Sequence, residues 1–304
     1  MGHDCDALVI GGGPAGLTAA IYLARYHLRT TVIDAGRSRA STIPRTRNHA
    51  GYPGGIPGAD LVAAMRAQAA ENGATIVGGH VDALAPAADK FVATIGGSSV
   101  TARAVLLATG VVNRRPRIAD DLHAAALAAG ALRYCPVCDG FEVTDKRVAV
   151  IGTGDHGVKE ALFLRSFTAD LTLVAADGAH DLSAADRTAL ADAGIVVVDG
   201  PAADFALADG GMAVTTAAGR LTFASVYPAL GSHIRSDLAA AIGAATVEAG
   251  CIVVDDHQRT SVPGLYAAGD VVIGLDQISH AMGEGGVAAT TLRNDLAART
   301  PLRR

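Results

Sequence analysis

The chain has 304 residues, half of them apolar, with a net charge of −5 and no tryptophan. This length predicts about two domains, and the apolar half is ample for a buried core. Basic and acidic residues are mixed, so no basic stripe indicates a nucleic-acid surface. No apolar run reaches the ~18 residues that a membrane-spanning helix needs. The 36 glycines favour an α/β nucleotide-binding architecture, in which backbone approaches ligand and helices closely.

A βαβ unit is predicted at the N-terminus. A buried strand, a glycine-rich turn, a helix and a second strand follow one another over 6–10, 11–16, 17–26 and 30–34. Gly11, Gly13 and Gly16 hold the positions of a Gly-x-Gly-x-x-Gly turn, where bare backbone can approach a pyrophosphate. We therefore predict a dinucleotide site, with the helix N-terminus on the phosphates and Asp34 accepting from ribose hydroxyls.

The next segment is predicted to begin with a loop over 37–60. A helix and three strands follow, over 59–72, 76–81, 91–95 and 104–108. The last of these strands is buried and ends in Thr109-Gly110.

The N-terminal pattern then restarts, over 147–151, 152–157, 158–167 and 171–177. Its glycines are Gly152, Gly154 and Gly157, and its second strand again ends in an acid, Asp177. The repeat predicts a second nucleotide fold. The alternative is a duplicated fold that no longer holds a ligand. Near the C-terminus, 262–270 is predicted as a turn, a strand and a loop acid, and 282–296 as a helix.

Cys135-Pro136-Val137-Cys138 lies between the two glycine turns. Such a pair can be a dithiol or a disulfide, and so carries two electrons. A structural zinc site would need four ligands, but Cys5 and Cys251 are lone and distant, and no histidine follows at finger spacing. We predict redox use and no metal. With no secretory leader, four cysteines favour a reducing compartment, and we expect the cytoplasm.

A carboxylate, Asp139, follows the cysteine pair directly. A thiolate leaving group needs a proton source nearby, and Asp139 is the candidate for that role. The alternative is a carboxylate that caps a short helix.

These motifs together resemble the low-molecular-weight thioredoxin reductases. The motifs that carry the resemblance are Gly11–Gly16, Ala108–Gly110, Cys135–Gly140, Gly152–Gly157 and Gly264–Asp270. The resemblance implies an α/β, three-layer fold of two Rossmann-like βαβ domains, the second inserted into the first. Residues 1–113 and 236–304 would form the FAD-binding domain, and 114–235 an NAD(P)-binding-like domain with the cysteine pair. It also implies a homodimer in which the inserted domain rotates.

The resemblance also assigns residues. Those expected at FAD are Gly11, Gly13, Pro14, Ala15, Gly16, Asp34, Asn48, Thr109, Gly110, Gly269, Asp270, Gln277 and Ile278. Those expected at a possible NAD(H) are Gly152, Gly154, Gly157 and Asp177. Cys138 would lie against the flavin, Cys135 would attack the partner's disulfide, and Asp139 would pass protons.

Three features depart from the family. In place of an arginine cluster that grips the 2'-phosphate of NADPH, residues 175–181 contain no arginine and include Asp177, which would repel a phosphate. We therefore predict that NADPH is a poor donor and that NADH, or no nicotinamide, is used. Pro136 inside the pair is also seen in relatives that oxidise small dithiols, although it equally suits the first turn of a helix. Glu284 has no function that the sequence explains.

The sequence leaves three alternative functions open. The first is a flavin-dependent disulfide reductase that passes electrons to a thioredoxin-like protein, with NADH or a small electron carrier protein as donor. The second is an oxidase of a small dithiol, with oxygen as acceptor. The third is a non-catalytic flavin redox sensor.

Overall fold

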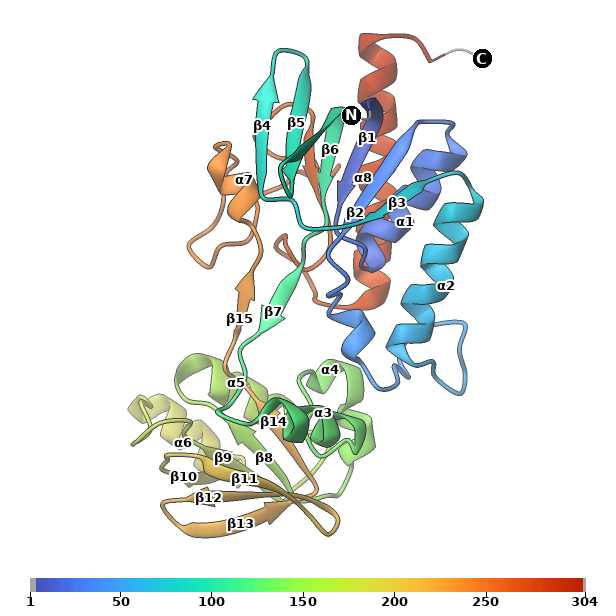
Figure 1. The fold of residues 1–304 in the computed structure, drawn as a ribbon. Coiled ribbons are helices and arrows are strands. Elements are labelled where there is room, and N and C mark those ends of the chain that lie inside the picture. The colour runs from blue at the N-terminus through green and yellow to red at the C-terminus, as the bar shows by residue number, and fades with distance from the viewer. Residues whose placement is uncertain (1–3, 303–304) are drawn as a thin grey trace. The chain divides into compact units, whose positions relative to one another are not determined.

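The computed structural model describes residues 4–302, which divide into two compact units (Figure 1). Unit 1 contains the chain up to Arg45, His49–Val112 and the chain from Ile234 onward; unit 2 contains Thr46–Asn48 and Asn113–His233. The chain leaves unit 1 through β7 (Val111–Asn113) and returns through β15 (Ser232–Ile234), and these two strands pair. Within the described range, no helix is long and apolar enough to cross a membrane.

Unit 1 is built on one mixed sheet in the order β3-β2-β1-β6-β5-β4, with β16 also paired to β6. Its strands are β1 (Asp4–Ile10), β2 (Thr30–Asp34), β3 (Thr75–Gly78), β4 (Ala83–Ala87), β5 (Lys90–Ile95), β6 (Ser98–Leu107) and β16 (Leu265–Ala267). Strands β1, β2, β3, β6 and β16 run parallel, and the β4–β5 hairpin adds antiparallel strands. The carboxyl ends of the parallel strands therefore meet at one edge, where α/β folds bind ligands.

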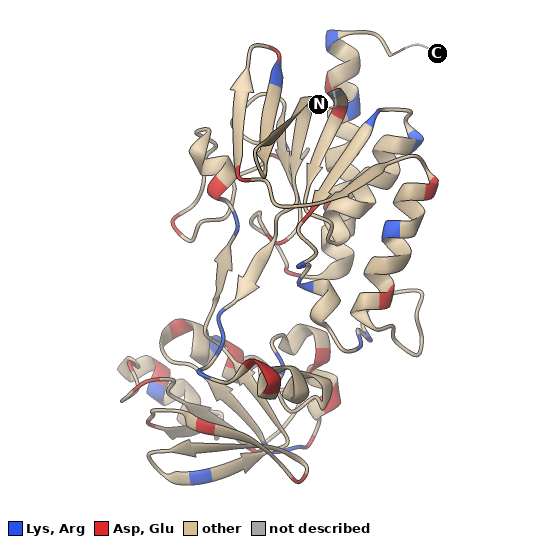
Figure 2. Cartoon of the chain, viewed as in Figure 1, with Lys and Arg blue, Asp and Glu red and all other residues tan. Residues whose placement is uncertain are grey.

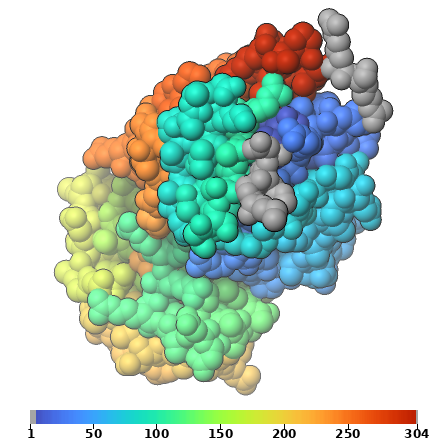
Figure 3. Space-filling model, turned by 45° about the horizontal axis from the view of Figure 1, so that its top comes forward, coloured from blue at the N-terminus to red at the C-terminus, as the bar shows by residue number. Residues whose placement is uncertain are grey.

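Three helices cover one face of this sheet, and their apolar side chains form one core cluster with it. They are α1 (Pro14–Arg25), α2 (Gly58–Glu71) and α8 (Ile278–Arg299). A Cβ on Gly285 would lie 2.3 Å from the Ala15 carbonyl oxygen, so only glycine lets α8 pack this close to α1. The end of α8 reaches the surface near the β4–β5 hairpin (Figure 3). Shorter helices η1 (Ala40–Thr42) and α7 (Asp237–Ala241) complete the unit.

Unit 2 has a parallel sheet in the order β10-β9-β8-β14. The strands are β8 (Val148–Ile151), β9 (Leu171–Val174), β10 (Val196–Val198) and β14 (Ser225–Pro228). Alternate residues of β8 enter opposite core clusters, one with α5 (Gly154–Leu164) and α6 (Ala184–Asp192). The other cluster holds α3 (Asp120–Ala128) and an antiparallel sheet, β11 (Ala203–Ala208), β12 (Gly211–Thr216) and β13 (Gly219–Phe223).

The predicted α/β class with a Rossmann-like sheet in each unit is confirmed. Several bounds differ from expectation: for example, α8 begins at Ile278 rather than 282, β9 ends at Val174 rather than 177, and β3 ends at Gly78 rather than 81. The first turn of α8 contains the polar Ser279 and His280, which hide the apolar period. Basic and acidic residues are interspersed over both units (Figure 2).

Candidate functional site

The first glycine turn ends at a helix start that is open to an anion. Gly13 is the N-cap of α1 and makes no side-chain capping bond, Pro14 follows at the first position, and the first turn contains no acid. The first N–H groups of a helix have no partner inside it, and they carry the positive end of its dipole. This turn can therefore accept a pyrophosphate, as predicted for Gly11–Gly16.

Asp34 ends β2 against this turn. Its Oδ1 accepts from the Gly36 N–H at 2.9 Å, and its Oδ2 accepts from Arg66 Nη1 of α2 at 2.6 Å. A Cβ on Gly12 would lie 2.4 Å from Asp34 Cγ, so the carboxylate lies directly beside the glycine backbone. The acid is thus fixed where a ribose hydroxyl next to the pyrophosphate would meet it. Arg66 belongs to no motif, so this contact could not be predicted from the sequence.

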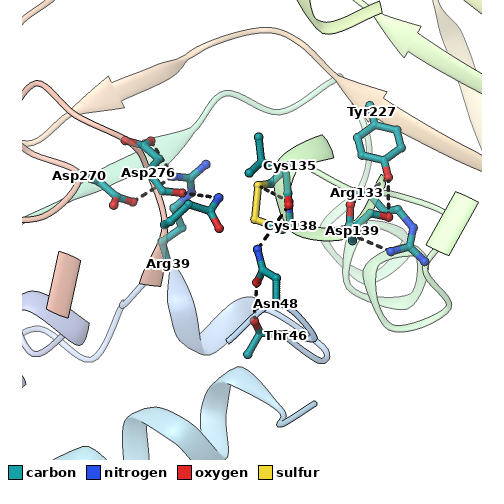
Figure 4. Close-up of a disulfide and its surroundings, with 12 residues drawn as sticks. Arg39, Thr46, Asn48, Arg133, Cys135, Cys138, Asp139, Tyr227, Asp270 and Asp276 are labelled. Atoms are coloured by element: carbon teal, nitrogen blue, oxygen red, sulfur yellow. Dashed lines mark hydrogen bonds and ion pairs between the residues drawn. A yellow bond between two sulfur atoms is a disulfide. The ribbon is translucent and has the colours of Figure 1, made fainter. Parts of the chain in front are cut away.

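A second group of predicted FAD residues ends the neighbouring strands β6 and β16. Thr109 Oγ1 donates to the Arg235 carbonyl at 2.6 Å, and a Cβ on Gly110 would meet no heavy atom within 4 Å. Asp270 Oδ2 accepts from Arg39 Nη1 at 3.0 Å, and the same nitrogen donates to Asp276 Oδ2 at 2.8 Å (Figure 4). Burial, then the charge of Asp270, raises the pKa of Asp276.

The remaining predicted FAD residues fall in two places. Gln277 is the N-cap of α8 and Ile278 its first residue. Asn48 lies in the short segment grouped with unit 2, where its Nδ2 donates to the Val137 carbonyl at 3.3 Å and its Oδ1 lies 3.1 Å from Thr46 Oγ1.

Unit 1 thus fits a dinucleotide such as FAD. It combines an uncapped helix start, an acid beside the glycine turn and polar groups at the carboxyl ends of β6 and β16. FAD, where bound, would supply two-electron chemistry.

The cysteine pair forms a disulfide, with Sγ atoms 2.08 Å apart and Cα atoms 5.2 Å apart. Cys135 is the N-cap of the short helix α4 (Pro136–Asp139), and its Sγ accepts from the Cys138 N–H at 3.1 Å. Pro136 occupies the first helical position, where a missing N–H costs nothing. A backbone N–H directed at Cys135 Sγ stabilises a thiolate on that sulfur.

Asp139 lies in a charged cluster beside the pair. Arg133 Nη1 donates to its Oδ2 at 2.8 Å, and the Tyr227 hydroxyl donates to its Oδ1 at 2.9 Å (Figure 4). Burial raises the pKa of Asp139, while Arg133 and then Tyr227 oppose the rise. A carboxyl with a raised pKa holds its proton nearer to neutral pH, which suits a proton donor to a leaving thiolate. Tyr227 comes from β14, 88 residues away, and Arg133 from the loop before the cysteine pair, and neither carries a motif, so sequence reasoning missed them.

Glu160 of α5 is a second acid in this region. Burial, and then the charge of Asp139, raises its pKa to about 7. Among the described residues, no group forms a hydrogen bond with its buried Oε1. The sequence feature that points to Glu160 is a charged residue at the edge of the apolar face of α5, beside Val158 and Ala161.

The second glycine turn is hydrogen-bonded to the segment that follows β9. The Gly154 N–H donates to the Asp181 carbonyl at 3.1 Å, and Thr153 Oγ1 accepts from the Asp181 N–H at 2.9 Å. His180 is buried; its Nε2 donates to the Val198 carbonyl at 2.9 Å, which leaves Nδ1 to accept from Thr153 Oγ1 at 3.3 Å. One N–H at the start of α5 is therefore already used by the chain itself.

Asp177 also differs from its counterpart Asp34. Its side chain is 78% exposed and lies 3.7 Å from Arg117, which is itself exposed. The first turn of α5 contains an acid, Asp155, whereas that of α1 contains none. The second site is therefore less favourable for a phosphate than the first glycine turn; its residues are Gly152, Gly154, Gly157 and Asp177.

No cluster of three or more His, Cys, Asp or Glu side chains that could hold a metal occurs in the part of the chain described.

Comparisons with known proteins agree with this geometry. The family described as pyridine nucleotide-disulphide oxidoreductase matches residues 5–285. A thioredoxin reductase of Listeria innocua is 31% identical over 297 residues, which cover 93% of this chain and 91% of that protein. The crystal structure of thioredoxin reductase from Streptococcus pyogenes aligns with a TM-score of 0.88 at 27% identity, over 98% of this chain and 100% of that chain. The crystal structure of HlmI aligns with a TM-score of 0.87 at 28% identity, over 99% of each chain.

Proposed function

This chain belongs to the pyridine nucleotide-disulphide oxidoreductases, as a member of the low-molecular-weight thioredoxin reductases, and we propose the following path for its electrons. The chain is an FAD-dependent thiol-disulfide oxidoreductase. Electrons pass from FAD in unit 1 to the Cys135–Cys138 disulfide, and from the resulting dithiol to the disulfide of a thioredoxin-like protein. The observation that carries this proposal is the disulfide at the start of α4 beside the Asp139 cluster.

Each residue of the pair has a role in this path. Cys135 attacks the partner's disulfide as a thiolate, forms a mixed disulfide and releases one partner thiolate. Cys138 then attacks Cys135, reforms the internal disulfide and releases the second partner thiolate. The Cys138 N–H directed at Cys135 Sγ supports this assignment of the nucleophile. Asp139 supplies a proton to a leaving thiolate.

FAD is held by the residues predicted for it. The start of α1 holds the pyrophosphate, Asp34 the adenosine ribose and Asp270 the ribityl chain, with Gln277 and Ile278 beside the ring system. The open helix start and the fixed carboxylate of Asp34 support this arrangement. Arg39 and Arg66, which pair with Asp270 and Asp34, keep both acids oriented.

NADPH is a poor electron donor in this proposal, and NADH or a small electron carrier protein serves instead. Three features support it: Asp177 lies shortly after β9, Asp155 lies in the first turn of α5, and the Asp181 carbonyl takes up the Gly154 N–H. The 2'-phosphate of NADPH carries extra negative charge, so these acids repel NADPH more strongly than NADH. Arg117 beside Asp177 offsets part of that repulsion.

The proposed partner is a protein rather than a bare small molecule. Val137 and Phe141, on either side of Cys138 in sequence, are 45% and 79% exposed. Exposed apolar side chains beside a reactive pair favour a protein surface as docking partner. By analogy with the family, the same proposal includes a homodimer, rotation of the inserted domain and a location in the cytoplasm.

A small-molecule dithiol oxidase is the second candidate, favoured by Pro136 and by the hydrogen bond that takes up the Gly154 N–H of the second glycine turn. Anaerobic titration separates the two. Bleaching of the flavin band by NADH supports the reductase, whereas bleaching by a small dithiol, with peroxide on admitting air, supports the oxidase. Slow bleaching by all donors would indicate a sensor or a carrier-fed reductase, and an added carrier protein then distinguishes these.

A further inference from the structure

Glu284, which the sequence left without a function, lies inside unit 1 and bonds to backbone. Its Oε2 accepts from the Gly269 N–H at 2.7 Å, and the residue is only 8% exposed. A buried carboxylate that receives a backbone N–H at this distance makes a strong, charge-assisted hydrogen bond. It also connects α8 to the turn that follows β16.

The second carboxylate oxygen of Glu284 is held as well. His280, one helical turn earlier in α8, places its Nε2 2.9 Å from Glu284 Oε1. The His280 side chain is 43% exposed, so it connects the buried carboxylate to solvent. Burial, and then the charge of Asp270, raises the pKa of Glu284, while the Gly269 N–H and His280 oppose the rise.

The turn that Glu284 holds has a conformation that requires glycine. Gly269 has a φ of +79°, and a Cβ there would lie 2.9 Å from the Ala15 Cβ of the first glycine turn. The next residue is Asp270, which pairs with Arg39. The Gly269 peptide thus lies between the proposed pyrophosphate site and the proposed ribityl contact.

We propose that Glu284 is a positioning residue for FAD: it fixes the Gly269–Asp270 turn so that Asp270 faces the cofactor, and His280 holds the Glu284 carboxylate in place. The proposal rests on the proposed FAD site of unit 1. It concerns binding and geometry, so it can be tested without turnover.

The test compares FAD affinity across variants of the full chain, stripped of flavin and titrated with FAD at neutral pH. Glu284→Ala leaves the Gly269 N–H unpaired and should weaken FAD about ten- to a hundred-fold. Glu284→Gln keeps an acceptor oxygen for that N–H and should stay within about three-fold of wild type. Glu71→Ala, at an exposed acid of α2, is the matched control and should not change affinity. Far-UV circular dichroism verifies that each variant is folded.

Two further measurements separate positioning from general stability. His280→Ala should weaken FAD less than Glu284→Ala, and the double variant should be no weaker than Glu284→Ala, because His280 acts through Glu284. Wild-type affinity should fall by up to about three-fold on the acid side as Glu284 gains a proton, because the neutral carboxyl keeps only a weaker acceptor oxygen, and Glu284→Gln should lack that part of the fall. Asp270, Asp276, His280 and Arg39 face this site in both proteins, so the difference between the profiles belongs to Glu284.

A folded Glu284→Ala protein with wild-type FAD affinity would overturn the proposal. So would identical pH profiles for wild type and Glu284→Gln. Wild-type protein that takes up no FAD would overturn the proposed function and this inference together.

Discussion

The Tyr227 hydroxyl donates a 2.9 Å hydrogen bond to Oδ1 of Asp139, and so joins β14 to the helix that carries the cysteine pair. Tyr227 is fully buried, so its ring cannot follow the carboxylate if that moves. Arg133 holds the other oxygen and is itself anchored by the Gly130 carbonyl at 3.0 Å. Both oxygens of Asp139 thus have fixed directions, which a proton donor needs.

Removing this hydroxyl should shift the pH dependence of the thiol chemistry. The Tyr227 bond lowers the pKa of Asp139, so Tyr227→Phe should raise that pKa and let Asp139 keep its proton to higher pH. The limb of the pH–rate profile that reports loss of this proton should therefore move to higher pH. Asp139→Asn should slow turnover about a hundred-fold. The control is Tyr134→Phe, which removes the hydrogen bond to His123 and should leave this limb of the profile in place. If the limb does not move in Tyr227→Phe, the bond between Tyr227 and Asp139 does not have the proposed role.

Glu160 should make the fold less stable as pH rises. Its pKa is about 7 in the folded chain and 4.5 as a free side chain, so the folded state binds the extra proton. The stabilisation is complete below pH 4.5 and is lost as pH rises to about 7. At ~1.4 kcal/mol per pKa unit, the loss is on the order of 3 kcal/mol.

Glu160→Gln should remove that dependence. The measurement is the thermal midpoint of both proteins between pH 5 and pH 8, because the difference between the two curves cancels the other titrating groups. Wild type should lose stability relative to the variant across this range. Parallel curves would mean that Glu160 is solvated and has an ordinary pKa.

The sequence predicted the parts of this site that depend on local backbone. Both glycine turns, the strands before them and the acid that ends β2 follow from local spacing, because the turn needs glycine where backbone meets backbone. The Cys135–Cys138 pair follows for the same reason, since its spacing alone allows a disulfide.

The contacts that orient the site could not be predicted in this way. Tyr227 and Asp139 are 88 residues apart, and Glu284 and Gly269 meet only because α8 packs on α1. Asp177 and Asp34 both follow a glycine turn, a helix and a strand, yet one is 78% exposed and the other 9%, because Asp34 ends β2 beside Gly12 whereas β9 ends before Asp177. Such differences depend on packing between distant elements, which local periodicity does not record.

The charge of Asp177 should limit the use of NADPH. Asp177→Asn removes one negative charge from the end of the second βαβ unit and should raise kcat/KM for NADPH about three- to ten-fold, with little change for NADH. Asp209→Asn, at an exposed turn of the same unit, is the control. Wild type that prefers NADPH over NADH in flavin reduction would contradict the assignment.

The central claim is that FAD exchanges electrons with the cysteine pair, and anaerobic reductive titration of purified protein tests it most directly. Wild type should be yellow and take up about four electron equivalents per chain, two for flavin and two for disulfide, whereas Cys135→Ser should bind FAD but take up about two. A colourless wild type that binds no flavin, or equal electron uptake by both proteins, would contradict the account.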